Sequence, residues 1–177
     1  PIADVKKPPA PPDRKRLFTD DETKQILLAL NYRGEAVTLL QHQVAIALLL
    51  AFETGMRAGE MLGMTWGVVN LLGKYVTLPE TKNGDERDVP LSPKAIDLII
   101  KLKGLDKSSV FTITSASLDA LFRKAKDSCN IENLHFHDSR ANAITMLSKK
   151  LPILDLARMI GHRDIKNLMI YYRESAT

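Results

Sequence analysis

The strongest constraint on the fold of this chain is an apolar segment between Leu39 and Glu53, which predicts a strongly apolar helix. Gly55 follows this segment and is the expected stop of the helix, because glycine accepts the left-handed conformation that is common at helix ends. The longest uninterrupted apolar run, Val44 to Phe52, is far shorter than the roughly 20 residues that cross a bilayer. We therefore expect no membrane association.

Length and composition indicate one compact domain in a reducing compartment. The chain has 177 residues, of which 45% are hydrophobic and 26% are charged, so it is neither disordered nor fibrous. Its single cysteine, Cys129, excludes a disulfide framework and a cysteine-rich zinc site. No charged and apolar leader of the kind that directs secretion opens the chain, so a cytoplasmic protein is expected. The first residue is Pro1 rather than Met, which suggests a fragment or a processed form.

The chain begins with a proline-rich segment and is expected to become helical near Thr19. Five of the nine prolines lie within the first 12 residues, where they exclude a helix, and basic residues occupy positions 14–16. Thr19 and Glu22 have the spacing of a capping box ahead of an apolar helix. Ser92-Pro93 is the expected start of a later helix that runs to about Lys103.

Short strands and further helices complete the expected fold. Gly73 and Asn83-Gly84 mark two tight turns between three strand-like segments. The expected strands are Trp66–Asn70, Lys74–Leu78 and Arg87–Leu91. The further expected helices are Ala58–Gly63, Ser117–Ser128, Ser139–Lys149, Ile153–Ile160 and Ile165–Tyr172. The predicted fold class is mainly α with a small three-stranded antiparallel β-sheet (α+β).

Two charged segments are candidate parts of a site, although each has an ordinary structural explanation. Glu60 lies three residues after Arg57, and on a helical turn it can face the guanidinium and orient it. A surface ion pair is the alternative. Lys82 lies at the tip of the expected hairpin, where its ammonium can reach a ligand phosphate or donate a proton. A solvated lysine in a turn is the alternative.

Residues 135–140 (HFHDSR) are richer in chemically active groups. If a helix starts near Asp138, His137 and Arg140 are three residues apart and can address one cluster of ligand oxygens. His135, His137 and Asp138 are also potential metal ligands. We favour a site without a metal, because no second ligand cluster accompanies them and the nearby arginine opposes a cation.

The last candidate segment is residues 160–172 (IGHRDIKNLMIYY), which contains His162. Asp164 is a good N-cap for a helix that follows it. Four apolar residues recur at helical spacing and predict one face packed against the core. They are Ile165, Leu168, Met169 and Tyr172. Tyr171 falls on a more polar face, so it is available for chemistry.

Together these segments suit attack on a phosphodiester. Guanidinium groups stabilise the charge of a pentacoordinate transition state, and a tyrosine oxygen can form a covalent intermediate. No serine or cysteine nucleophile with a partner stands out, and no GxxxxGK[ST] phosphate loop is present. The net charge is +4, and residues 101–177 carry the excess, with 13 Lys and Arg against 8 Asp and Glu. A phosphate-handling surface is expected in this C-terminal part.

In this order and spacing, four segments resemble the tyrosine recombinase (phage integrase) family. Residues 54–66 (TGMRAGEMLGMTW) resemble its first arginine box, and residues 80–91 (ETKNGDERDVPL) resemble its lysine hairpin. Residues 136–140 (FHDSR) resemble its His-x-x-Arg box, and residues 160–172 resemble its terminal histidine and tyrosine. The family's tyrosine usually lies nine residues after this histidine, which points to Tyr171.

The resemblance implies how the phosphate is bound and attacked. Arg57, Arg140 and His162 would bind the non-bridging oxygens of the scissile phosphate. Tyr171 would attack the phosphorus to give a 3′-phosphotyrosine and a free 5′-hydroxyl. The chain would therefore be an enzyme, a site-specific DNA recombinase or integrase.

Three supporting roles follow from the same resemblance. Lys82 would be the general acid that protonates the leaving oxygen, and His137 would assist proton transfer or hold the phosphate. Glu60 would orient Arg57. No metal and no other cofactor would be needed, because the phosphotyrosine conserves the bond energy for religation.

Partners and domain organisation are also implied by the resemblance. The substrate would be double-stranded DNA, on which the full-length protein would form a homo-tetramer, in the bacterial nucleoid or a phage-infected host. Residues 1–18 would be a proline-rich and basic linker, and residues 19–177 would be the catalytic domain. We expect no counterpart in this chain of the family's N-terminal DNA-clamping domain.

The sequence leaves three other functions open. A type IB topoisomerase-like enzyme that relaxes DNA would use the same chemistry, and a non-catalytic DNA-binding protein could keep the same fold. A metal-dependent phosphoesterase would use His135, His137 and Asp138. We favour an integrase of a prophage or similar mobile element. The compactness of the chain and the spacing of the hairpin lysine favour a recombinase over a topoisomerase, and the motifs of a non-catalytic protein would lack the nucleophile or an arginine, neither of which is missing here.

Overall fold

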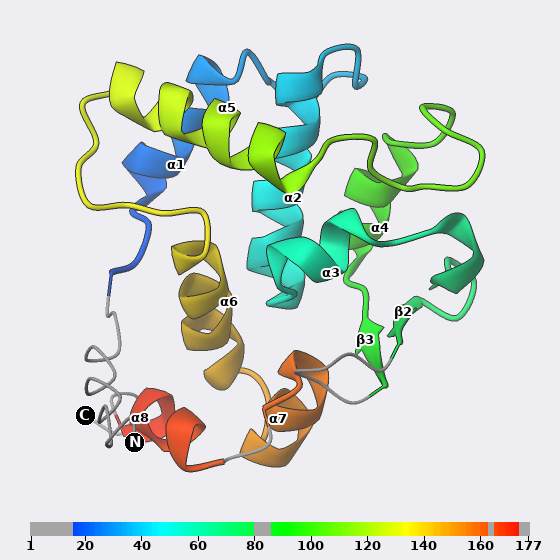
Figure 1. The fold of residues 1–177 in the computed structure, drawn as a ribbon. Coiled ribbons are helices and arrows are strands. Elements are labelled where there is room, and N and C mark those ends of the chain that lie inside the picture. Colours follow the sequence, from blue (N-terminus) through cyan, green and yellow to red (C-terminus); the bar gives the residue numbers. More distant parts are fainter. Residues whose placement is uncertain (1–15, 80–85, 163–164, 174–177) are drawn as a thin grey trace, which may run out of the picture.

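The computed structural model describes residues 16–79, 86–162 and 165–173. Within these residues the fold is mostly helical with one small antiparallel sheet, so the expected fold class is confirmed (Figure 1). The helices are α1 (Asp20–Ala29), α2 (Leu40–Thr54), α3 (Ala58–Leu62), α4 (Pro93–Ile100), α5 (Ser115–Ser128), α6 (Asp138–Ser148), α7 (Ile153–Ile160) and α8 (Lys166–Arg173). The strands are β1 (Val69–Asn70), β2 (Tyr75–Leu78) and β3 (Arg87–Pro90), and a 3-10 helix (Trp66–Val68) precedes β1.

Helix α2 forms the centre of the hydrophobic core. Most of its residues are buried, including its successive residues from His42 to Leu48, and it contacts α3, α4, α5 and α6. A helix that is apolar on all sides has no face suited to water, so neighbouring helices have to surround it. Gly55 ends α2 in the left-handed conformation with φ of 64°, as the sequence predicts.

Local capping sets where two other helices begin. The Thr19 side chain accepts a hydrogen bond from the Glu22 backbone N–H at 3.1 Å, and the Glu22 carboxylate accepts one from the Thr19 N–H at 2.9 Å. This is the predicted capping box of α1. The Ser92 hydroxyl accepts from the backbone N–H of Ala95, with Pro93 in the first turn of α4. Both helix starts are therefore confirmed.

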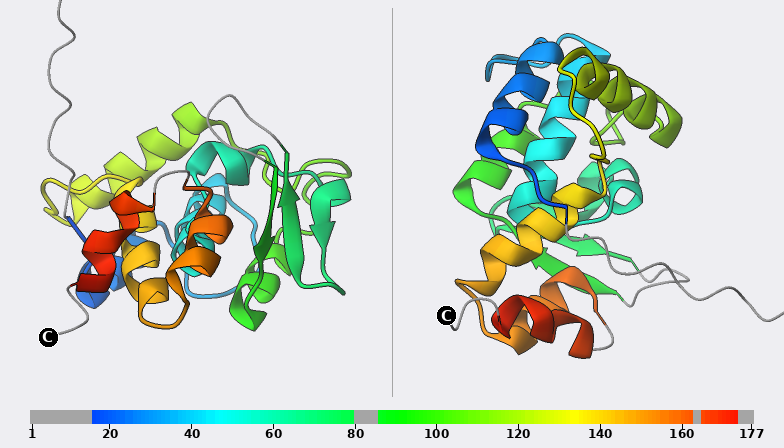
Figure 2. Two further views of the ribbon diagram at one scale, coloured as in Figure 1. Left: turned by 90° about the horizontal axis from the view of Figure 1, so that it is seen from below. Right: turned by 90° about the vertical axis from the view of Figure 1, so that its left-hand side faces the viewer.

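The C-terminal helices gather at one end of the molecule, next to the sheet. Helix α7 contacts α6, α8 and β3, and α6 also contacts α2. Figure 2 shows α7 and α8 below the layer formed by α1, α2 and α5, with the strands beside α7. This packing brings the end of α2, the start of β3, the start of α6 and the end of α7 into one region.

The sheet has the order β1-β2-β3, and its central pairing places Val76 opposite Val89, both fully buried. The expected first strand, Trp66–Asn70, is wrong over its first three residues, which form the 3-10 helix. The Trp66 backbone N–H donates to the Ser108 carbonyl at 2.8 Å, and its indole N–H donates to the Asp106 carbonyl at 3.1 Å. These bonds to the loop before α5 replace pairing with β2.

The expected apolar face of α8 is only partly correct. Leu168 is fully buried, but the side chains of Ile165 and Met169 are 38% and 40% exposed. Helix α8 contacts α6 and α7 at the edge of the fold, so only a narrow part of its surface meets the core. Periodicity predicts which residues share a face, but the width of the buried strip depends on the neighbouring helices.

Several expectations concern residues outside the described ranges. They include Lys82, the Asn83-Gly84 turn, the Asp164 cap and most of the proline-rich segment, positions 1–15. Among the helices that the structure describes, none has the length and apolar character needed to cross a membrane.

Candidate active site

Arg57 and Glu60 lie at the start of α3, directly after the turn that ends α2. The Glu60 carboxylate accepts hydrogen bonds from the Arg57 backbone N–H at 2.8 Å and from Arg57 Nη1 at 2.9 Å. The Glu60 side chain is largely buried, whereas 35% of the Arg57 side chain is exposed. The contact that the sequence predicts is present, and it leaves part of the Arg57 guanidinium open to solvent.

A second arginine, Arg87 at the start of β3, shares the same carboxylate. Its Nη2 atom lies 2.9 Å from both carboxylate oxygens of Glu60. Burial on its own would raise the pKa of Glu60, but the hydrogen bonds from the Arg57 backbone and from Arg87 outweigh it, so the pKa lies below its ordinary value. Glu60 is therefore ionised at neutral pH and holds two arginines at once.

Sequence reasoning assigned no role to Arg87, although a signal was present. Side chains alternate between the two faces of a strand, so Arg87 lies on the same face as Val89. Val89 is fully buried and Asp88 is exposed. The alternation predicts an arginine turned toward the interior, where it requires a partner carboxylate.

Arg140, in the first turn of α6, is almost completely buried and connects two other elements. Its Nη1 atom donates to the Gly55 carbonyl, and its Nη2 atom donates to the Ile160 carbonyl at 2.6 Å. Burial, together with the nearby charge of Arg57, lowers the pKa of Arg140 to about 10. The guanidinium remains protonated at neutral pH and is held between the end of α2 and the end of α7.

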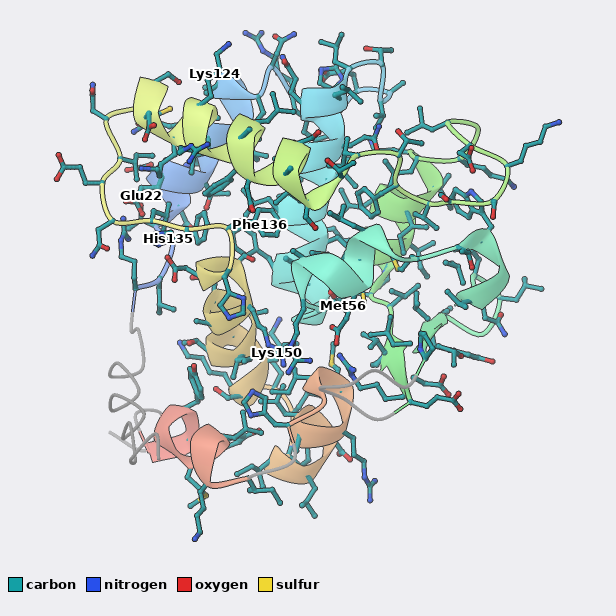
Figure 3. The ribbon with its side chains drawn as sticks, viewed as in Figure 1. Glu22, Met56, Lys124, His135, Phe136 and Lys150 are labelled. Atoms are coloured by element: carbon teal, nitrogen blue, oxygen red, sulfur yellow. The ribbon has the colours of Figure 1, made fainter. Side chains whose placement is uncertain are left out.

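His137 lies at the start of α6, next to a residue that anchors the loop before it. Phe136 is buried and meets Phe122 of α5 edge to face, with ring centroids 5.6 Å apart (Figure 3). His137 itself is exposed. Desolvation by its neighbours and the charge of Arg140 lower the pKa of His137, so the imidazole is neutral at neutral pH and can accept a proton.

The alternative metal site finds no support among the described residues. Asp138 is buried, and its carboxylate accepts a hydrogen bond from the His135 backbone N–H at 2.8 Å, which holds the loop before α6 against the helix. The His135 ring is 64% exposed. No group of three His, Cys, Asp or Glu residues in the described ranges could hold a metal ion.

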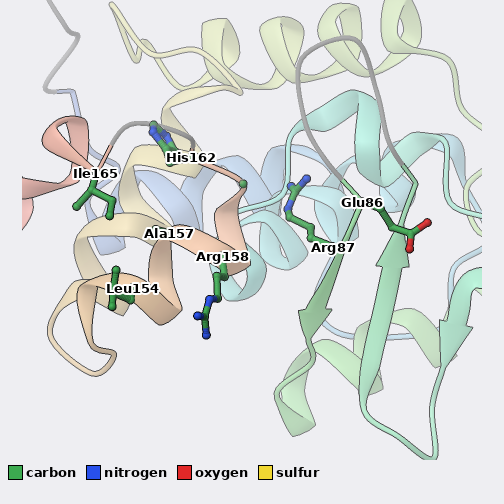
Figure 4. Close-up of a pocket in the computed structure, with 8 residues that line it drawn as sticks. Glu86, Arg87, Leu154, Ala157, Arg158, His162 and Ile165 are labelled. Carbon is green, nitrogen blue, oxygen red and sulfur yellow. The ribbon is translucent and has the colours of Figure 1, made fainter.

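His162 follows Gly161, which ends α7 in the left-handed conformation with φ of 67°. The His162 backbone N–H donates to the Ala157 carbonyl at 3.0 Å, so its place relative to α7 is defined. A cavity of about 350 Å³ lies between β3 and α7. Figure 4 shows the Arg87 side chain reaching from β3 toward the turn that carries His162, with Arg158 pointing the other way.

The two tyrosines of α8 have different surroundings. The Tyr172 hydroxyl donates to the Leu151 carbonyl at 2.6 Å, so this residue is engaged by the loop between α6 and α7. Tyr171 is half-buried against the small cluster around Ile144, and it is among the groups whose charge acts on Arg140. The structure therefore brings Tyr171 close to the arginine site.

The candidate residues that the structure describes gather at one site, whose described charges suit an anion. Arg57 and Arg87 both contact one carboxylate, Glu60, and the charges of these three groups act on Arg140. Such an excess of guanidinium groups favours an anion with several oxygens, such as a phosphodiester. Lys82 lies outside the described residues, so its place in this arrangement is not defined.

Sequence comparison relates almost the whole chain to known proteins. Residues 16–177 match the sequence profile of the phage integrase family. A Haemophilus influenzae protein named integrase/recombinase is 38% identical, over 97% of this chain and 57% of that protein. The shufflon-specific DNA recombinase of Escherichia coli is 32% identical, over 97% of this chain and 43% of that protein.

Solved structures share the fold at lower sequence identity. The catalytic domain of bacteriophage HP1 integrase has a TM-score of 0.66 and 19% identity, and covers 89% of this chain and 86% of that chain. The XerA recombinase structure has a TM-score of 0.68 and 18% identity, and covers 91% of this chain and 61% of that chain. The chain spans about half the length of the sequence relatives that it matches.

Proposed function

Because the chain belongs to the phage integrase family, we propose that it is the catalytic domain of a site-specific DNA recombinase that cleaves and rejoins strands through a 3′-phosphotyrosine. The substrate is double-stranded DNA, and the full-length protein assembles as a homo-tetramer on it. Residues 1–18 are the linker into this domain. The names of several relatives support this proposal, because they are recombinases or integrases.

The observation that carries the proposal is the paired arrangement of Arg57 and Arg140. Arg140 donates to the carbonyl of Gly55, two residues before Arg57, and the charge of Arg57 contributes to its lowered pKa. Two guanidinium groups held this close repel each other, and a bound phosphodiester would relieve the repulsion. Both groups are fixed before substrate arrives, which favours stabilisation of charge that develops in a transition state.

In the proposed reaction, the Tyr171 oxygen attacks the scissile phosphorus. The Tyr171 O–P bond forms as the bond from phosphorus to the 5′-oxygen breaks, so the phosphodiester is exchanged rather than hydrolysed. His137 accepts the phenol proton, consistent with a lowered pKa that keeps it neutral, and Lys82 protonates the leaving 5′-oxygen. A 5′-hydroxyl from a second strand reverses these steps and rejoins the DNA.

Tyr171 is preferred over Tyr172 as the nucleophile for a structural reason. The hydroxyl of Tyr172 is bound to a backbone carbonyl in the α6–α7 loop, whereas Tyr171 lies near enough to Arg140 for an ionised Tyr171 oxygen to raise the pKa of that guanidinium. A nucleophile has to lie near the groups that bind the phosphate.

The test is incubation of the chain with a nicked DNA half-site that traps the covalent adduct. We expect a DNA–protein adduct with the wild type and with Tyr172→Phe, and none with Tyr171→Phe. An adduct that persists in Tyr171→Phe and disappears in Tyr172→Phe would overturn the assignment. A chelator should leave adduct formation unchanged, and loss of the adduct on chelation would favour the metal-dependent alternative.

A further inference from the structure

We propose that Arg87 is a positioning residue that sets the orientation of both Arg57 and His162 for strand cleavage. The inference rests on the function proposed above. Arg87 is assigned no contact with the nucleophile or with a reacting atom. It acts through two groups that it contacts directly, the carboxylate of Glu60 and the last turn of α7.

The first contact fixes Arg57 through Glu60. The Glu60 carboxylate receives two hydrogen bonds from Arg57 and two contacts from Arg87 Nη2, all between 2.8 and 2.9 Å. The side chains of Arg87 and Glu60 are each only 9% exposed. Without Arg87, the buried Glu60 carboxylate would keep Arg57 as its single cationic partner. The carboxylate would then be free to rotate, and the orientation of the Arg57 guanidinium would no longer be fixed.

The second contact fixes the turn that carries His162. The last four carbonyls of a helix have no hydrogen-bond donor within the helix. In α7, each of these four carbonyls accepts a hydrogen bond from a group outside the helix. The backbone N–H groups of His162 and Gly161 donate to the first two, at 3.0 and 3.3 Å. Arg87 Nε donates to the Met159 carbonyl at 3.0 Å, and Arg140 Nη2 donates to the Ile160 carbonyl at 2.6 Å. Two cations at this end also stabilise the helix dipole.

Gly161 lets the Arg87 guanidinium approach this closely. A Cβ atom at position 161 would lie 2.9 Å from Arg87 Cζ and 2.9 Å from its Nη1 atom, which is closer than real Cβ contacts. The guanidinium therefore lies directly against the backbone of the residue before His162. One side chain from β3 thus joins the start of α3 to the end of α7.

The experiment measures single-turnover cleavage of the nicked half-site and, separately, DNA affinity. Arg87→Ala is expected to lower the cleavage rate by about 100-fold, because a small misplacement of binding groups costs this much. DNA affinity should change by less than about twofold, because the Arg87 side chain is only 9% exposed and its donors are used by Glu60 and Met159. Arg87→Lys keeps the charge but not the forked geometry, so it should lose on the order of 10-fold. It also carries the test if Arg87→Ala does not fold.

A pH profile separates positioning from a purely structural role. In Arg87→Ala, burial still raises the pKa of Glu60 while the opposing bonds from Arg87 are gone. The other charged groups that face Glu60, Arg57 and Arg140, are unchanged. The acid side of the cleavage profile should therefore move to higher pH in Arg87→Ala, and less in Arg87→Lys.

The matched control is Arg158→Ala, which removes the same charge near the same cavity. The Arg158 side chain is 82% exposed and lies 3.9 Å from Asp155, so its loss should change cleavage by less than about twofold. If neither the wild type nor Arg87→Ala forms an adduct, the proposed function is contradicted. If the wild type cleaves and Arg87→Ala cleaves with the same rate and pH profile, only the role of Arg87 is overturned.

Discussion

The Nη2 atom of Arg140 lies 2.6 Å from the carbonyl oxygen of Ile160, which joins the start of α6 to the end of α7. The two residues belong to different sequence motifs, and this bond joins the arginine of the first motif to the end of α7, two residues before the histidine of the second. The opposite edge of the same guanidinium binds the Gly55 carbonyl at the end of α2. One buried side chain therefore holds together three segments of the candidate site.

Arg140→Lys is expected to lose both stability and cleavage. A lysine presents one ammonium and cannot hold two separated carbonyls in the same way, so one buried carbonyl loses its partner at a cost of about 1–3 kcal/mol. Urea unfolding measures this loss, and the half-site assay measures cleavage, which should fall by about 100-fold or more. Arg33→Lys, on the exposed surface, is the control and should change neither. Normal cleavage by Arg140→Lys would show that the guanidinium fork is dispensable.

Glu60→Gln is expected to flatten the pH dependence of unfolding in acid. The folded-state pKa of Glu60 lies below its ordinary value of 4.5, so ionised Glu60 stabilises the fold fully above about pH 4.5. That contribution is lost as the pH falls through the folded-state pKa. Urea unfolding across this range should show a shallower loss in the variant than in the wild type. Glu132→Gln, an exposed position, should behave as wild type, and an equal slope in all three proteins would contradict the prediction.

Gly161→Ala is expected to cost more stability than Gly104→Ala. Both glycines have positive φ, 67° and 97°, so an alanine pays a conformational cost of about 1 kcal/mol at either site. At position 104 nothing lies within 4 Å of the added Cβ, whereas at position 161 it meets Arg87. Thermal unfolding of both variants gives the comparison, and because φ at position 104 lies further from the left-handed minimum near +57°, the difference is a lower bound on the packing contribution. Equal losses would mean that Arg87 moves aside freely.

Tyr172→Phe is expected to lower stability without removing the covalent adduct. The substitution deletes the hydrogen bond to the Leu151 carbonyl, which is worth about 1 kcal/mol, and leaves the ring in place. Tyr171→Phe should remove the adduct, because the nucleophilic oxygen is gone. Urea unfolding and the half-site assay, run on both variants, give the comparison. Loss of the adduct in Tyr172→Phe would contradict the prediction.

Much of the fold follows from short-range patterns. The capping box at Thr19 and the glycine stop at Gly55 depend on residues within about four positions of each other, and both are as predicted. The predictions that are wrong, the start of the first strand and the apolar face of α8, depend on contacts with segments that are distant in the sequence. Trp66 pairs with the loop at Ser108, and Ile165 and Met169 on the expected apolar face of α8 remain 38% and 40% exposed.

The sequence by itself determined the order of the elements and the chemical types at the candidate site, because caps, periodicity and motif spacing are local. Tertiary structure alone decided that Arg87 joins Glu60 to the end of α7, and that Arg140 joins α2 to α7. The bonds from Arg87 to Met159 and from Arg140 to Gly55 span 72 and 85 residues. The partners of a buried charge depend on which distant carbonyls and carboxylates the packed core brings beside it.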